Sequence, residues 1–278
     1  MIGFILLYRM TRSVHAPNSA DPYYQSDAFV KPPDIAATQK ASDFAEIAKR
    51  KFRIPIIMYH YVEFVADPTD AIRKKLDTVP TAFEHQLKSL KDAGYETFFI
   101  KDIPDIFSGK IQYNPKSVII TFDDGYEDFY TDAYPILKKY NMKATQFIIY
   151  NFINRPNYMK ESQIRDLSHG GLIEIASHTL NHTGLKGLSE KAARKEIFDS
   201  KQMLEEKFGI TVSTFAYPYG SFNAMAEQLV REAGYTAAVS VIPGIEQSED
   251  NMFYLYRIRP GNFGMGDVVK MLENYKNK

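Results

Sequence analysis

The chain has 278 residues, of which 45% are hydrophobic, enough for one large globular core or two small ones. Lysine plus arginine and aspartate plus glutamate number 34 each, so no net charge draws the protein toward nucleic acid or an anionic membrane. The absence of cysteine excludes disulfides and thiol catalysis, but it does not fix the cellular compartment.

Residues 1–52 are predicted to be a tail and linker ahead of a catalytic domain at 53–278. The apolar run at 2–7 is too short to span a bilayer, and Arg9 and Arg12 follow it, whereas a secretory signal has its positive charge first. If the run is the remnant of a signal or anchor, we expect a cell-envelope or secreted protein. If the N-terminus is complete, we expect a cytoplasmic one. Membrane association is expected only through this segment.

Beyond the linker, apolar strand-like runs alternate with amphipathic helical patterns. Strands are expected at 54–62, 117–122, 144–150, 172–177, 211–216, 236–241 and 253–258. Helices are expected to begin at Thr81 and end at Gly94, and to cover 128–140, 160–168, 189–208, 223–233 and 266–275, whereas 63–80 is expected to be a loop. This alternation predicts a parallel sheet.

Two details concern individual helices. Thr81 and Glu84 have the spacing of a capping box, which predicts that Thr81 caps the first helix. Pro135 lies in the middle of the helix expected at 128–140, where proline predicts a kink.

Candidate catalytic residues lie where two of the strands end. Asp123 and Asp124 come directly after one apolar run, and His178 and His182 follow another. Two imidazoles four residues apart converge if the backbone makes one helical turn, and with one carboxylate they leave a metal position open for water, as in hydrolytic centres. The remaining carboxylate is then a candidate general base. Taken alone, the aspartate pair also fits an ordinary turn, and the histidine pair also fits an ordinary surface position.

Active-site residues at several strand ends favour an α/β barrel over an open doubly wound sheet. The two motifs resemble the metal-binding signatures of the polysaccharide deacetylase family (carbohydrate-esterase family four, the NodB-homology domain). Residues 53–60 (RIPIIMYH) and 215–220 (FAYPYG) resemble the opening strand and third motif of its subgroup of biofilm poly-N-acetylglucosamine deacetylases. The resemblance runs from residue 53 to the C-terminus and implies a distorted (β/α)7 barrel with a single catalytic domain.

The resemblance also implies a role for each site residue. In the family the first aspartate of the pair is the base and the second binds the metal, so Asp123 is the expected base, and Asp124, His178 and His182 are the expected ligands. Zn²⁺ is the expected ion, although Co²⁺ or Ni²⁺ also suits these ligands. The family's late catalytic histidine is missing, since no histidine follows His182. The subgroup implies His60 as the acid that protonates the leaving amine.

The third motif departs from the usual family pattern. Ala216 stands where an arginine normally orients the base. We therefore expect Arg257 or Arg259 to pair with Asp123, with Arg257 as the first choice, because the guanidinium fork suits a carboxylate. The resemblance further implies that the backbone N–H of Tyr219 stabilises the tetrahedral oxyanion.

The sequence thus predicts a metal-dependent hydrolase that removes N-acetyl groups from N-acetylglucosamine residues of a polysaccharide and releases acetate. The polysaccharide is the expected partner and nucleic acid is not. Two alternatives stay open: a hydrolase of a small non-peptide amide on the same fold, and a glycan-binding module that has lost turnover. Peptidoglycan, chitin-like oligomers and poly-N-acetylglucosamine are not distinguished, because that choice depends on loop shape.

Overall fold

A computed structural model describes residues 51–65, 67, 69–260 and 268–276. The predicted N-terminal tail therefore lies outside the described residues, except for its last two positions. None of the helices in the described part of the chain combines the length and hydrophobicity that a membrane span requires.

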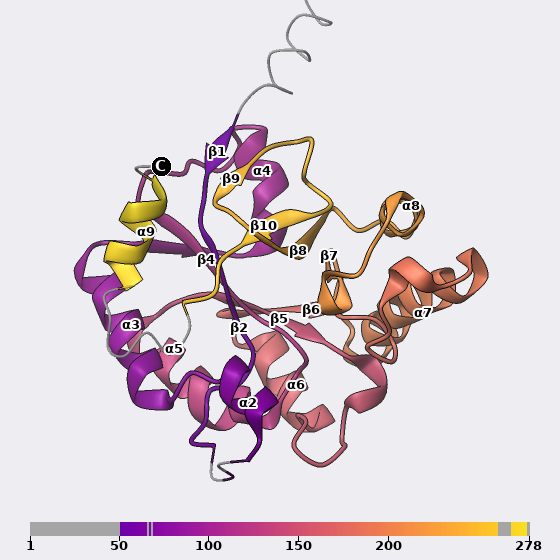
Figure 1. Cartoon of the computed structure of the whole chain (residues 1–278), viewed down its shortest axis with the longest axis horizontal. Coiled ribbons are helices and arrows are strands. Elements are labelled where there is room, and N and C mark those ends of the chain that lie inside the picture. Colours follow the sequence, from indigo (N-terminus) through magenta and orange to yellow (C-terminus); the bar gives the residue numbers. More distant parts are fainter. Residues whose placement is uncertain (1–50, 66, 68, 261–267, 277–278) are drawn as a thin grey trace, which may run out of the picture. The chain divides into compact units, whose positions relative to one another are not determined.

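Seven parallel strands form a sheet with the order β10-β8-β7-β6-β5-β4-β2 (Figure 1). They are β2 (Ile56–Tyr59), β4 (Ser117–Phe122), β5 (Ala144–Ile148), β6 (Ile173–Ser177), β7 (Thr214–Ala216), β8 (Ala237–Pro243) and β10 (Leu255–Arg257). Ile258, just after β10, donates its N–H to the carbonyl of Ile56 and accepts from the N–H of Met58, both at 2.9 Å. These bonds join the two edge strands, so the sheet is nearly closed and the predicted distorted barrel is confirmed.

Three short strands were not predicted. β3 (Glu96–Phe98) pairs in parallel with the first half of β4, whereas β1 (Phe52–Arg53) and β9 (Glu246–Gln247) form a separate antiparallel pair. Runs of two or three residues are too short to show the alternation that identifies a strand in a sequence.

Helices surround the sheet in Figure 1. They are α2 (Ala71–Leu76), α3 (Pro80–Asp92), α4 (Ile103–Phe107), α5 (Tyr134–Tyr140), α6 (Glu161–His169), α7 (Glu190–Phe208), α8 (Ala224–Glu232) and α9 (Val268–Lys276). The loop expected at 63–80 is therefore interrupted by α2. The first two residues of the helix expected at 266–275 lie outside the described residues.

Two proline residues mark the start of α3 and the irregular turns before α5. Thr81 does not cap α3, because the helix already begins at Pro80 with Val79 as its N-cap and has no side-chain cap. Proline suits the first turn, where its missing N–H would have no partner within the helix. The helix expected at 128–140 is present, and its turns at Phe129–Ala133 are π-helical and lead without a break into α5, where Pro135 lies in the first turn.

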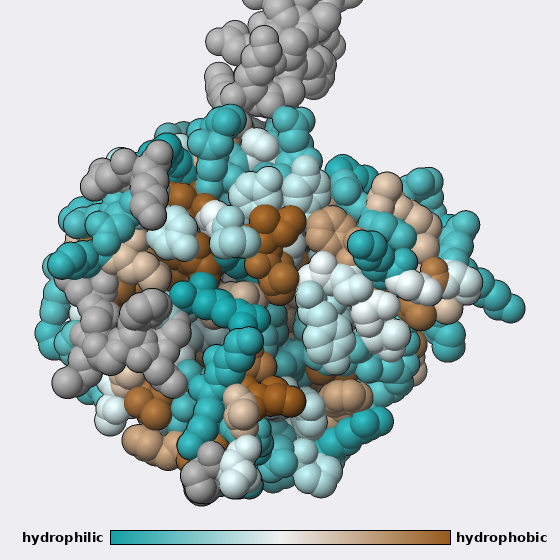
Figure 2. Space-filling view, in the orientation of Figure 1, coloured by the Kyte–Doolittle hydropathy of each residue, from teal (hydrophilic) through white to brown (hydrophobic). Residues whose placement is uncertain are grey.

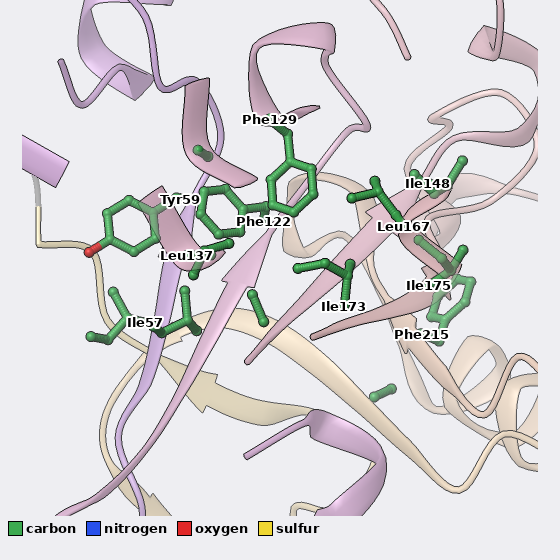
Figure 3. Close-up of a cluster of buried hydrophobic side chains, with 14 of the residues drawn as sticks. Ile57, Tyr59, Phe122, Phe129, Leu137, Ile148, Leu167, Ile173, Ile175 and Phe215 are labelled. Atoms are coloured by element: carbon green, nitrogen blue, oxygen red, sulfur yellow. The ribbon is translucent and has the colours of Figure 1, made fainter. Parts of the chain in front are cut away.

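Successive residues of the strands alternate between two hydrophobic clusters. Ile57 and Ile120 belong to the larger cluster, which packs against the helices and includes the stacked rings of Tyr59 and Phe122, 5.2 Å apart (Figure 3). Ile56 and Ile119 belong to the smaller cluster, together with Phe147, Ala176, Ala216 and Val239 from the other strands. This smaller cluster fills the inside of the barrel.

Helix α4 closes one end of that interior. Its side chains Ile103, Ile106 and Phe107 belong to the smaller cluster and pack with Ile54, which precedes β2. The closed end is therefore the one where the strands begin. The polar residues described next lie at the other end, where the strands finish.

Candidate metal centre

Asp124, His178 and His182 come together beyond the ends of β4 and β6. One ligand atom from each lies within 4.8 Å of the others. The Nε2 atoms of His178 and His182 are 3.3 and 3.2 Å from Oδ1 of Asp124. That oxygen is buried and has no hydrogen-bond partner among the described residues. A buried carboxylate oxygen facing two imidazole nitrogens, without a hydrogen bond, has surroundings that a divalent cation would complete, so the donor set fits a metal ion.

A second contact orients the ring of His178. Its Nδ1 lies 2.8 Å from the carbonyl oxygen of Ala216 on β7. Because a carbonyl only accepts, Nδ1 must carry the proton, which leaves the lone pair of Nε2 free on the side of Asp124. Burial opposes ionisation of Asp124, but the two imidazoles outweigh it and hold the pKa of its carboxyl well below the usual value.

The turn between the two histidines is not helical, so that part of the prediction was wrong. Thr179 and His182 have φ of 69° and 59°, in the left-handed region that residues other than glycine rarely adopt. The N–H of His182 donates to Oγ1 of Thr179 at 3.0 Å. The imidazoles converge through this irregular turn, which sequence spacing alone does not reveal.

Glu196 on α7 holds the same turn from outside. Its carboxylate accepts hydrogen bonds from the N–H groups of Leu180 and Asn181 at 3.0 and 2.9 Å, and from Nδ2 of Asn181 at 2.7 Å. Sequence reasoning missed Glu196, because it looks like any charged residue of an amphipathic helix. Its burial, at 9% exposure, is what distinguishes it.

Asp123 lies beside the three candidate ligands and is paired with Arg257 from β10. The two guanidinium nitrogens of Arg257 donate to Oδ1 and Oδ2 of Asp123 at 2.7 and 2.8 Å, and Nε donates to the carbonyl of Ser240 at 2.7 Å. Burial raises the pKa of the Asp123 carboxyl, but the Arg257 guanidinium outweighs it, so the net shift is downward. Of the two arginines considered for this pair, Arg257 is the one that makes it.

His60, at the end of β2, lies next to Asp123. Its Nε2 is 3.9 Å from Oδ2 of Asp123. Burial lowers the pKa of His60, the two neighbouring carboxylates oppose this, and Arg259 and Arg257 reinforce it, with a net shift downward. At neutral pH the resting imidazole is therefore neutral.

Tyr219 lies beside His182 in the lining of the cleft. Its φ is 58°, so the turn at Pro218–Gly220 bends through a left-handed residue. The ring contacts that of His182, with centroids 4.4 Å apart, and the residue is 70% exposed. Its ring thus borders the opening of the site.

The three candidate ligands, Asp123, His60 and Tyr219 face one cleft of about 480 Å³, a size typical of small-ligand sites. Its lining comprises Asp123, Asp124, His178 and His182, together with His60, Ala71, Ile72, Lys75, Leu76, Tyr219, Val241 and Arg259. Helix α2 thus forms a wall of the cleft, which the sequence did not predict. Figure 2 shows hydrophobic surface near α2 and near β8 and β10, in agreement with the exposure of Ile72 and Ile242.

Comparison with known proteins finds relatives that are named as deacetylases. A family model described as polysaccharide deacetylase matches residues 110–238. YxkH of Bacillus subtilis (strain 168), named for the same family, is 35% identical over 214 residues, which are 76% of this chain and 74% of YxkH. The poly-beta-1,6-N-acetyl-D-glucosamine N-deacetylase of Staphylococcus aureus (strain MSSA476) is 28% identical over 218 residues, 74% of this chain and 75% of that protein.

Among solved structures, the Streptococcus pyogenes deacetylase PplD in complex with acetate superposes with a TM-score of 0.74 at 29% identity. The match covers 80% of this chain and 99% of that one. The segment matched by the family model contains Asp123, Asp124 and both histidines of the candidate centre, whereas His60 and Arg257 lie outside it.

Proposed function

The chain belongs to the polysaccharide deacetylase family, and we propose that it is a metal-dependent hydrolase that removes N-acetyl groups from N-acetylglucosamine residues and releases acetate. The observation that carries the proposal is the three-ligand set of Asp124, His178 and His182 with an ion-paired carboxylate, Asp123, beside it. The name of the Staphylococcus aureus relative favours poly-β-1,6-N-acetylglucosamine as the polymer.

Asp124, His178 and His182 would hold the ion, and Zn²⁺ suits two imidazoles and a carboxylate best. A bound divalent ion supplies a water whose pKa is lowered to about 7. The protein's own contribution is to fix the donors: the carbonyl of Ala216 sets the tautomer of His178, and Glu196 holds the turn that carries His182.

Asp123 and His60 would move the proton in sequence. Asp123 accepts a proton from the attacking water as the C–O bond to the acetamide carbonyl forms. Its lowered pKa makes it a weak base that releases the proton readily, and imidazole is ordinarily the stronger base. His60, 3.9 Å away, then takes the proton and gives it to the amine nitrogen as the C–N bond breaks.

Because His60 receives its proton from Asp123 during the reaction, its lowered pKa is compatible with a role as the acid that protonates the amine. His60 is neutral before the reaction and is charged only by the proton that Asp123 passes on. The backbone N–H of Tyr219 would stabilise the oxyanion on the carbonyl carbon, a contribution typically worth about 3 kcal/mol.

The proposal is tested by acetate release from an N-acetylglucosamine pentamer and from the poly-β-1,6 polymer. Release is measured with Zn²⁺, after chelation, and with Asp123→Asn. Asp105→Asn, a change at a half-buried position on α4, is the matched control. We expect release that requires metal, disappears in Asp123→Asn and persists in the control. Bound metal without release from either substrate or from peptidoglycan fragments would instead favour the small-amide hydrolase.

A further inference from the structure

Two cationic side chains in the cleft are unpaired. Lys75 on α2 and Arg259, two residues after β10, both line it, and neither forms an ion pair or hydrogen bond with another described residue. By contrast, Lys110, on the surface beyond α4, pairs with Asp105 at 2.9 Å. The two unpaired cations come from separate elements and face the same space.

Two carboxylates share the cleft with these cations. Asp123 and Asp124 are the only acidic residues of the described lining; the first is ion-paired with Arg257, and the second faces the two imidazoles. In the described lining these two carboxylates match Lys75 and Arg259 in number, and Arg257, buried behind Asp123, adds a third cation, so a bound divalent ion would make the site clearly net positive. Burial lowers the pKa of Arg259, Asp123 and Asp124 oppose this, and Arg257 adds to it, with a net shift downward.

This charge matters because the proposed reaction changes the charge of the polymer. Hydrolysis turns a neutral acetamide into an amine that is protonated at neutral pH, and acetate leaves with the acyl group. A polymer that has reacted once therefore carries a cation next to unreacted units. Like charges brought together at a partly desolvated surface disfavour binding.

We infer that Lys75 and Arg259 form a charge filter at the cleft, which disfavours glucosaminium units beside the reacting sugar and keeps deacetylated units apart along the polymer. The inference rests on the proposed function. The filter is a specificity device: it acts on the neighbours of the reacting unit and takes no part in bond breaking.

The test compares kcat/KM for the fully acetylated pentamer with kcat/KM for a pentamer that carries one central glucosamine. For the unchanged protein with Zn²⁺ we expect a ratio of about ten or more in favour of the acetylated substrate. Lys75→Gln and Arg259→Gln should each lower this ratio, and the double variant should bring it to about two or less. Lys110→Gln, the same change at the closed end of the barrel, should keep the original ratio.

Product binding gives a readout independent of turnover. In calorimetric titrations of the zinc-loaded proteins with the glucosamine pentamer, the double variant should bind about tenfold more tightly than the unchanged protein. Equal affinities, or equal kcat/KM ratios in the two proteins, would overturn the filter. If the unchanged protein releases no acetate from the acetylated pentamer, the proposed function fails instead, and the titration still decides the charge effect.

Discussion

Replacing Arg257 by methionine tests how the site controls its carboxylate base. The change keeps a long side chain inside the barrel but removes the cation that donates to both oxygens of Asp123 at 2.7 and 2.8 Å. Breaking a buried ion pair from one side typically costs about 3–5 kcal/mol. For a domain of this size, 1 kcal/mol corresponds to roughly 2–4 °C in Tm, so we expect a fall in Tm of about 10 °C.

The same change should move the pH dependence of activity. In the unchanged protein, Arg257 holds the pKa of Asp123 below its ordinary value, so this pair stabilises the fold above that value and the effect is lost as the pH falls through the lowered pKa. Without the guanidinium, burial, the largest influence, is opposed only by His60 and His178, so we expect the pKa of Asp123 to rise. The acidic limb of kcat/KM should therefore move to higher pH, and turnover at neutral pH should fall by about 10²–10⁴.

Acetate release between pH 5 and pH 9, zinc content and calorimetric Tm would be measured on Arg257→Met and Arg257→Lys. Arg257→Lys keeps the charge without the fork, so its pH profile should lie between the other two. Arg194→Met, the same change at a half-buried position on α7, controls for effects that any arginine-to-methionine change would have. Full turnover with an unmoved acidic limb in Arg257→Met would refute the reasoning. Loss of zinc together with turnover would show that Arg257 supports the whole centre.

Three further predictions concern separate groups. His182→Ala should lower zinc affinity by more than tenfold in equilibrium dialysis, and retained affinity would remove His182 from the ligand set. His60→Gln should keep zinc but lower kcat by about 10²–10⁴ in acetate release, and an unchanged kcat would exclude it as the proton donor. Asp128 accepts from the N–H of Val62, and burial raises its pKa to about 7, so its stabilising effect is lost as the pH rises through 7. Asp128→Asn should therefore gain Tm over the unchanged protein at pH 8 but not at pH 5, and a gain that is equal at both would contradict the shift.

The barrel and the candidate ligands were predictable because both depend on local patterns. The apolar runs before Asp123 and His178 identify buried strands, and residues at the ends of parallel strands must meet at the same edge. That argument needs no knowledge of which strands are neighbours. The proximity of Asp124 and the two histidines could therefore be predicted from the sequence alone.

The remaining parts of the site depend on tertiary structure. Choosing between Arg257 and Arg259 requires the register of β10 against β8, which has an irregularity between Leu255 and Arg257. Helix α2 has no buried residue, so its sequence lacks the amphipathic pattern that predicts a helix. The left-handed Thr179 is imposed by its surroundings, since threonine has no intrinsic preference for that conformation.

The packed barrel interior restricts how a long polymer is handled. Side chains fill the inside and α4 covers the end where the strands begin, so a glycan strand has no passage along the barrel axis. A polymer must instead lie across the open end and present one acetamide group downward. We therefore expect such an enzyme to react at internal units of the polymer, without requiring a free chain end. We also expect the strand to leave sideways after each reaction.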